Sequence, residues 1–170
     1  MPITTTELEI RLSGGAANSD PNASIGGAKS STVLTDATLN NLFDDVSGAE
    51  SAAGDVEYRM VYIHNADPSL TATALKIFIS QDTTGTGDEI DIGLMAAANG
   101  ATETAVANES TAPGGGVTFT HPTTDSGGLV EENIANGSHG GFWIKRTVNV
   151  GGAAKTTNTG IITINADTAE

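Results

Sequence analysis

The sequence contains no cysteine, few aromatic residues and few cations. Without cysteine, the chain of 170 residues can form neither a disulfide framework nor a thiolate metal site. The 7 Lys and Arg residues against 21 Asp and Glu give a formal charge of -14, which repels a polyphosphate chain and leaves too few cations for a DNA footprint. The charge therefore argues against nucleic acid as a partner.

Long apolar runs are also missing from the chain. No stretch approaches 18 consecutive apolar residues, and the start, MPITTTELEIRL, has no basic region followed by an apolar stretch and a small-residue cleavage site. Lys and Arg are scattered, so no basic stripe is present that would dock on an anionic membrane. We therefore expect a protein made in the cytoplasm with no membrane partner.

The residues that are abundant, Thr, Ala, Gly, Asn and Asp, favour short strands joined by many turns. Residues 7–12 alternate between apolar and charged side chains, and residues 56–64 are rich in β-branched and aromatic residues. We predict an all-β chain, a single β-sandwich domain over residues 1–170 with about eight short antiparallel strands. The other predicted strands lie at 71–80, 89–95, 117–121, 141–150 and 160–166.

Two long segments carry little apolar character. Residues 13–32 are dense in Gly, Ser, Asn and Asp, and Ile25 is their one large apolar residue apart from the flanks. Residues 96–116 form a second stretch of low complexity. We interpret 13–32 as an extended loop or arm and 96–116 as a long exposed loop, and we expect both to order on a neighbouring subunit.

The segment 36–46 has two interpretations. Its apolar residues recur at helical spacing, which favours a short helical turn. In the other interpretation the segment is irregular, and Leu42 and Phe43 attach it to the core.

The catalytic motifs considered are absent from the sequence or incomplete. The sequence has no Gly-x-Ser-x-Gly turn, and His64, His121 and His139 lack a Cys or a His-x-x-x-His partner. Residues 26–30 are similar to a phosphate-binding loop, but Ala28 stands where that loop needs a glycine before its lysine. We therefore predict a chain that is not an enzyme and uses no cofactor.

One acidic turn, SQDTTGTGDEIDIG, gathers oxygen ligands of the kind that hard cations prefer. It lacks the twelve-residue spacing of an EF-hand. We interpret it as a solvated acidic turn and predict no metal, with Asp82, Asp88 and Asp91 kept as candidate Ca²⁺ ligands.

Three segments, LSGGAANSDPNASIGGAKSS, LFDDVSGAESAAGDVEYRMVYIHN and GFWIKRTVNV, resemble a set of tailed-phage virion structural proteins. The resemblance covers the N-terminal 65 residues and the C-terminal region. It implies no enzymatic activity. Because some β-rich proteins of this kind decorate or cement a capsid, it also implies a place on the capsid exterior.

From this resemblance we expect a capsid decoration (cement) protein that binds the major capsid protein and stabilises the assembled shell. We expect a homo-oligomer, with a trimer at capsid lattice points as one arrangement. A tail, neck or adaptor component is the first alternative, and a Ca²⁺- or carbohydrate-binding adhesion module that uses the acidic turn and Trp143 is the second. The candidate partner-binding residues are Ile25, Lys29, Leu42, Phe43 and Trp143.

Overall fold

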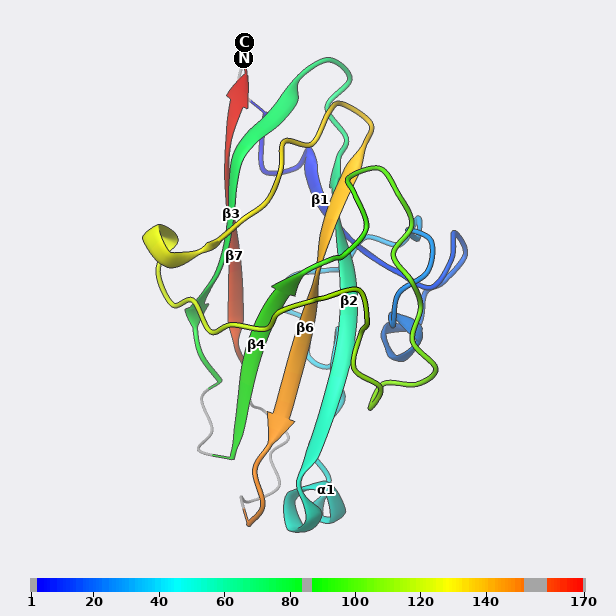
Figure 1. Cartoon of the computed structure of the whole chain (residues 1–170), viewed down its shortest axis with the longest axis vertical. Coiled ribbons are helices and arrows are strands. Elements are labelled where there is room, and N and C mark those ends of the chain that lie inside the picture. The colour runs from blue at the N-terminus through cyan, green and yellow to red at the C-terminus, as the bar shows by residue number, and fades with distance from the viewer. Residues whose placement is uncertain (1–2, 84–86, 152–158, 170) are drawn as a thin grey trace.

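The computed structural model describes residues 3–83, 87–151 and 159–169, which form two antiparallel sheets (Figure 1). The larger sheet has the strand order β1-β2-β6-β4, and the smaller has the order β5-β3-β7. The predicted all-β sandwich is confirmed. The strands are β1 (Leu8–Leu12), β2 (Asp55–Asn65), β3 (Thr71–Gln81), β4 (Asp88–Leu94), β5 (Leu129–Val130), β6 (His139–Val148) and β7 (Ile161–Ala169).

The main core lies between the two sheets. Val61 and Ile63 of β2 pack in one buried cluster with Ile77 and Ile79 of β3. Because successive side chains of a strand point to opposite faces, the intervening residues of β2 lie on the other side of the larger sheet. The period-2 pattern of the sequence therefore accounts for this core.

The second face of the larger sheet is also buried. Met60, Tyr62, Met95 and Trp143 form a separate cluster there, and Trp143 has no exposed surface. Partly buried side chains from the segment 106–119 pack against this cluster. Burial on both faces explains why β2 and β6 are apolar on both sides, as expected of central strands.

The helices are short. They are α1 (Gly48–Ala53) and the 3₁₀ turns η1 (Pro21–Ala23) and η2 (Asp125–Gly127). Ser47 caps α1, because its Oγ accepts the Glu50 N–H at 3.2 Å while Glu50 Oε2 accepts the Ser47 N–H at 2.6 Å. The segment 36–46 before it is irregular, and its Leu42 and Phe43 pack against the main core.

One predicted strand, 117–121, is wrong. Only Thr120 pairs there, in an isolated bridge with Ile92 of β4. Three glycines precede the segment and Pro122 follows it, so it is too short and too interrupted to continue the ladder. β5, which has two residues, was not predicted.

Candidate functional site

The glycine-rich segment 13–32 folds back onto its own sheet. Met60 N donates to Ser24 O at 2.7 Å, and Ser24 Oγ donates to Met60 O at 2.6 Å. The hydroxyl of Tyr62 donates to Gly27 O at 2.6 Å. These bonds continue the pairing of β2 beyond the end of β1, so the segment packs on its own sheet; contact of this segment with a neighbouring subunit stays a prediction.

The segment 96–116 forms a layer with this first loop. Gly27 N donates to Glu103 O at 2.9 Å, and Val106 N donates to Ile25 O at 3.0 Å. Gly26 has φ +95°, and a Cβ at this position would lie 2.5 Å from the Thr104 carbonyl oxygen. The close approach of the two backbones therefore requires glycine here.

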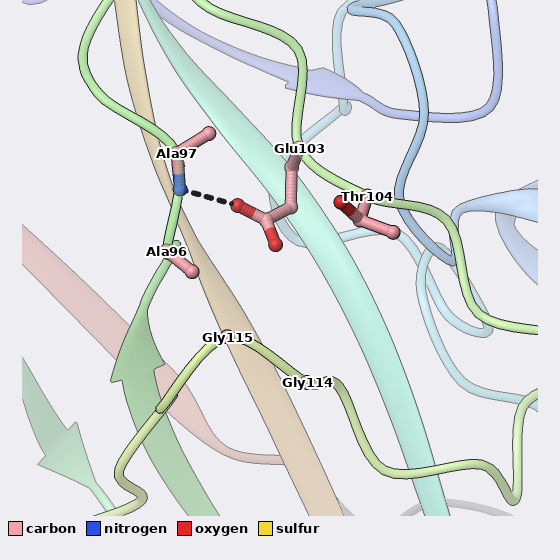
Figure 2. Close-up of a pocket in the computed structure, with 6 residues that line it drawn as sticks. All are labelled: Ala96, Ala97, Glu103, Thr104, Gly114 and Gly115. Carbon is pink, nitrogen blue, oxygen red and sulfur yellow. Dashed lines mark hydrogen bonds between the residues drawn. The ribbon is translucent and has the colours of Figure 1, made fainter.

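A cavity of about 250 Å³ opens inside the second loop (Figure 2). Glu103 is 3% exposed, and its Oε2 accepts the Ala97 N–H at 2.8 Å. The other carboxylate oxygen points away from this bond into the space beside the glycines (Figure 2). The lining residues are Ala96, Ala97, Glu103, Thr104, Gly114 and Gly115. Sequence reasoning missed Glu103, since a single acid in a Gly- and Ala-rich stretch resembles any surface residue.

Three acids of the predicted acidic turn, Asp82, Glu89 and Asp91, lie around His121, which the sequence did not associate with them. His121 Nε2 lies 3.1 Å from Asp82 Oδ2, and His121 Nδ1 lies 3.6 Å from Asp91 Oδ1 and 2.7 Å from Ile90 O. Possible ligand atoms of Glu89, Asp91 and His121 lie within 4.8 Å of one another.

A lysine competes with any cation at this cluster. Lys145 Nζ donates to Asp91 Oδ2 at 2.6 Å. Asp88 lies at the start of β4, where its carbonyl accepts a hydrogen bond from Thr83 Oγ1 at 2.6 Å, and it is not one of the three residues whose ligand atoms converge. The structure thus places two of the three Ca²⁺ candidates, Asp82 and Asp91, against the imidazole of His121, with the ammonium group of Lys145 bonded to Asp91.

A buried ion network accounts for Phe43. Arg59 and Arg146 both lie over its ring, at 5.2 Å and 4.9 Å from the ring centroid. Arg59 donates to Glu109 Oε2 at 2.6 Å, and Arg146 donates to Glu57 Oε2 through Nε at 2.6 Å. The network ties the segment 42–44 to β2, β6 and the second loop, so Phe43 has a packing role.

The remaining partner-binding candidates lie at different depths. Trp143 is fully buried on the second face of the larger sheet, so its interpretation as a partner contact or a sugar platform is corrected. The sequence alternation shows that Trp143 and Phe142 face opposite ways, but it does not show that the segment 106–119 covers the face that carries Trp143. Leu42, Ile25 and Lys29 are half-buried. Burial and the nearby Arg11 lower the pKa of Lys29.

Three further titratable groups are perturbed by burial. Burial raises the pKa of the Glu131 carboxyl to about 7. Burial also lowers the pKa of His64 and of His139, which face each other across β2 and β6. The His64 Nδ1 atom lies 2.9 Å from Ser138 O, and the His139 Nε2 atom lies 3.2 Å from Ala101 O. Both imidazoles thus contact backbone carbonyls.

The outer face of the smaller sheet, in contrast, is partly exposed, and η2 covers part of it, since Asn165 Nδ2 of β7 donates a hydrogen bond to Asp125 Oδ1 at 2.8 Å. Val130 of β5 is 66% exposed and Ile161 of β7 is 49% exposed, while Phe78 of β3 is half-buried between them in the sheet. β7 pairs only with β3, so among the described residues its second backbone edge has no strand beside it. We call this face and edge the β7 surface; it comprises Lys76, Phe78, Val130, Ile161 and Thr163.

Comparisons with protein-family models, with curated proteins and with solved structures find no match to this chain. No helix among the described residues is long and apolar enough to cross a membrane. The function must therefore be argued from the chain's own surfaces.

Proposed function

We propose that the chain is a non-enzymatic structural protein of a tailed-phage virion, and that it decorates the head by binding the major capsid protein. The observation that carries the proposal is the β7 surface. It combines a strand edge that no described strand pairs with and a partly exposed sheet face, which are two elements that a partner can use for strand addition. The tail, neck or adaptor alternative shares this chemistry and differs in location.

The edge of β7 has few of the usual devices against pairing, apart from two register shifts in its pairing with β3. An edge strand presents a row of unpaired N–H and C=O groups, and proteins protect such edges with Pro, Lys, bulges or covering loops. Residues 161–169, IITINADTA, contain neither Pro nor Lys. A nine-residue edge strand with neither Pro nor Lys supports a role in assembly, because such an edge can pair with a strand of a partner.

Charge supports an exterior position. The formal charge of -14 repels packaged DNA and keeps the protein soluble before it assembles. The buried ion network and the two interlocked loops hold the larger sheet, so the β7 surface is presented by a scaffold covered on its other side. We expect the protein to be a homo-oligomer on the shell.

Cryo-electron microscopy of virions tests the location. We expect density for the chain on the outside of the head, at lattice points of the major capsid protein. Density confined to the tail or neck would favour the tail, neck or adaptor alternative. The absence of the chain from virions would contradict the proposal.

Co-sedimentation with assembled shells tests the surface. Val130→Lys places a charge on the β7 surface, so we expect it to weaken shell binding at least tenfold, the effect of about 1.4 kcal/mol. Leu39→Lys is the matched control, because Leu39 is 58% exposed and lies outside the β7 surface. Equal loss in both variants would show that added charge, and not the β7 surface, is responsible.

The adhesion-module alternative loses its aromatic element, because Trp143 has no exposed surface on which a sugar ring would stack. The candidate cation site of this alternative is the cluster of Glu89, Asp91 and His121.

A further inference from the structure

We propose that the cavity lined by Glu103 and Thr104 binds a primary ammonium group, either a lysine side chain of a protein partner or a free alkylamine. This inference does not depend on the virion role, because the isolated chain is enough to test it.

The Glu103 carboxylate is the central feature of the cavity. The residue is 3% exposed, and Oε2 is held by the Ala97 N–H at 2.8 Å. No described residue donates a hydrogen bond to Oε1, which points into the cavity (Figure 2). Oε1 thus keeps unused acceptor capacity, and a charged donor there would form a charge-assisted hydrogen bond, which is roughly twice as strong as a neutral one.

The walls select a slender ligand. Ala96, Ala97, Gly114 and Gly115 carry no side-chain atom beyond Cβ, so the cavity of about 250 Å³ is bounded by backbone and methyl groups. A dry apolar cavity of about 150 Å³ can hold benzene, so a butyl chain fits the larger volume. The Thr104 hydroxyl is the second polar side-chain group in the lining.

Charge also favours a cation. None of the six lining residues is basic, and the formal charge of the chain is -14. The summed field of an acidic protein raises the local concentration of positively charged ligands in such a cavity. A lysine of a partner protein would therefore meet an attractive potential before it reaches Glu103.

The number of acceptors distinguishes an ammonium group from other cations. Calcium takes six to eight oxygen ligands, whereas the lining offers one free carboxylate oxygen and one hydroxyl as side-chain acceptors. A guanidinium group prefers two adjacent carboxylate oxygens, and Oε2 of Glu103 is already engaged. An ammonium group is compact and has three N–H donors, so it suits a small site with few acceptors.

An NMR titration of the full chain tests the proposal. The probes are Nα-acetyl-lysine methylamide and n-butylamine, and the control is the norleucine analogue, which has the same length without the charge. We expect saturable shifts of the Ala97, Thr104 and Gly115 amides with a dissociation constant on the order of 1 mM. Tighter binding of the lysine probe assigns the site to a protein lysine, and equal binding assigns it to free amines.

Two variants make the test specific. Glu103→Gln keeps an acceptor for the Ala97 N–H and removes the charge, so we expect about tenfold weaker binding or more. Glu132→Gln makes the same change at an exposed position and leaves binding unchanged. If Glu103→Gln does not fold, Thr104→Val removes the second acceptor and is expected to weaken binding severalfold. Absent shifts, equal shifts with the norleucine probe, or unchanged binding in the folded variant overturn the proposal.

Discussion

Glu57 accepts a 2.6 Å hydrogen bond from Nε of Arg146, the residue directly opposite it on β6. Both side chains are at least nine-tenths buried. Burial raises the pKa of the Glu57 carboxyl, and the charge of Arg146 opposes that shift. The pair is therefore a desolvated ion pair in which each partner depends on the other.

Removing Arg146 tests this dependence. We expect Arg146→Ala to lower the free energy of unfolding by about 3–5 kcal/mol, because the buried Glu57 carboxylate loses its hydrogen bond and its nearest charge and keeps only Arg59, whose Nη2 lies 3.9 Å from Oε1. Arg11→Ala is the matched control, since its pair with Glu9 is more exposed, and we expect a loss of about 0–1 kcal/mol. Urea denaturation at pH 7 measures both, and equal losses would contradict the interpretation.

A second prediction concerns Glu131 and pH. Burial raises the folded-state pKa from 4.5 to about 7, so the folded chain retains a proton that the unfolded chain has lost. The stability associated with the protonated carboxyl is present below pH 4.5 and is lost as pH rises through about 7. We expect Glu131→Gln to raise the free energy of unfolding at pH 8 by about 3 kcal/mol and to change it little at pH 4.

Urea denaturation across this pH range provides the comparison, with Glu89→Gln as the exposed control. The burial-lowered pKa values of His64 and His139 act in the opposite direction, since stability is lost there as pH falls, and they are present in every variant. A pH profile of Glu131→Gln that is parallel to the unsubstituted protein would show that Glu131 does not titrate in this range.

Two neighbouring glycines provide a third test. Gly115 and Gly116 both have positive φ. A Cβ at Gly115 would lie 2.6 Å from the Ala96 Cβ, whereas a Cβ at Gly116 would have no heavy atom within 4 Å. We expect Gly116→Ala to cost about 1–2 kcal/mol from the backbone alone. Gly115→Ala should cost about 1–3 kcal/mol more because of the overlap. The double variant Gly115→Ala with Ala96→Gly should lose this additional cost, as urea denaturation would show. If it does not, the overlap with Ala96 is not its cause.

The cluster at His121 makes a fourth prediction. Because Lys145 Nζ already lies 2.6 Å from Asp91 Oδ2, we expect neither EDTA nor added Ca²⁺ to change the melting temperature. Lys145→Met frees this carboxylate, so added Ca²⁺ should raise the melting temperature of that variant. Stabilisation of the unsubstituted protein by Ca²⁺ would contradict the role assigned to Lys145.

Much of the sandwich was predictable from periodicity. The predicted strands at 7–12, 56–64 and 71–80 correspond to β1, β2 and β3, because alternation and β-branched content are local signals. β5 has only two residues, which is too short for any period to register. The segment 117–121 carried the pattern but meets the sheet at a single bridge.

The site was less predictable because its contacts are remote in sequence. The acids of the turn were recognised from their spacing, but His121 reaches them only through the bridge between Thr120 and Ile92. The burial of Trp143 depends on loops that attach to the sheet by backbone bonds such as the one between Met60 and Ser24. Bonds of this kind have no hydrophobic pattern and leave no periodic signal.

The layer of interlocked loops has an evolutionary consequence. The bonds between the two loops are made by main-chain atoms, as between Gly27 and Glu103 and between Ile25 and Val106, so these bonds place no demand on side-chain identity. Gly26 is an exception, because any larger residue meets the Thr104 backbone. Homologues would therefore keep a few glycines at fixed spacing while the rest of the sequence diverges. Their structural similarity would remain detectable after their sequence similarity is lost.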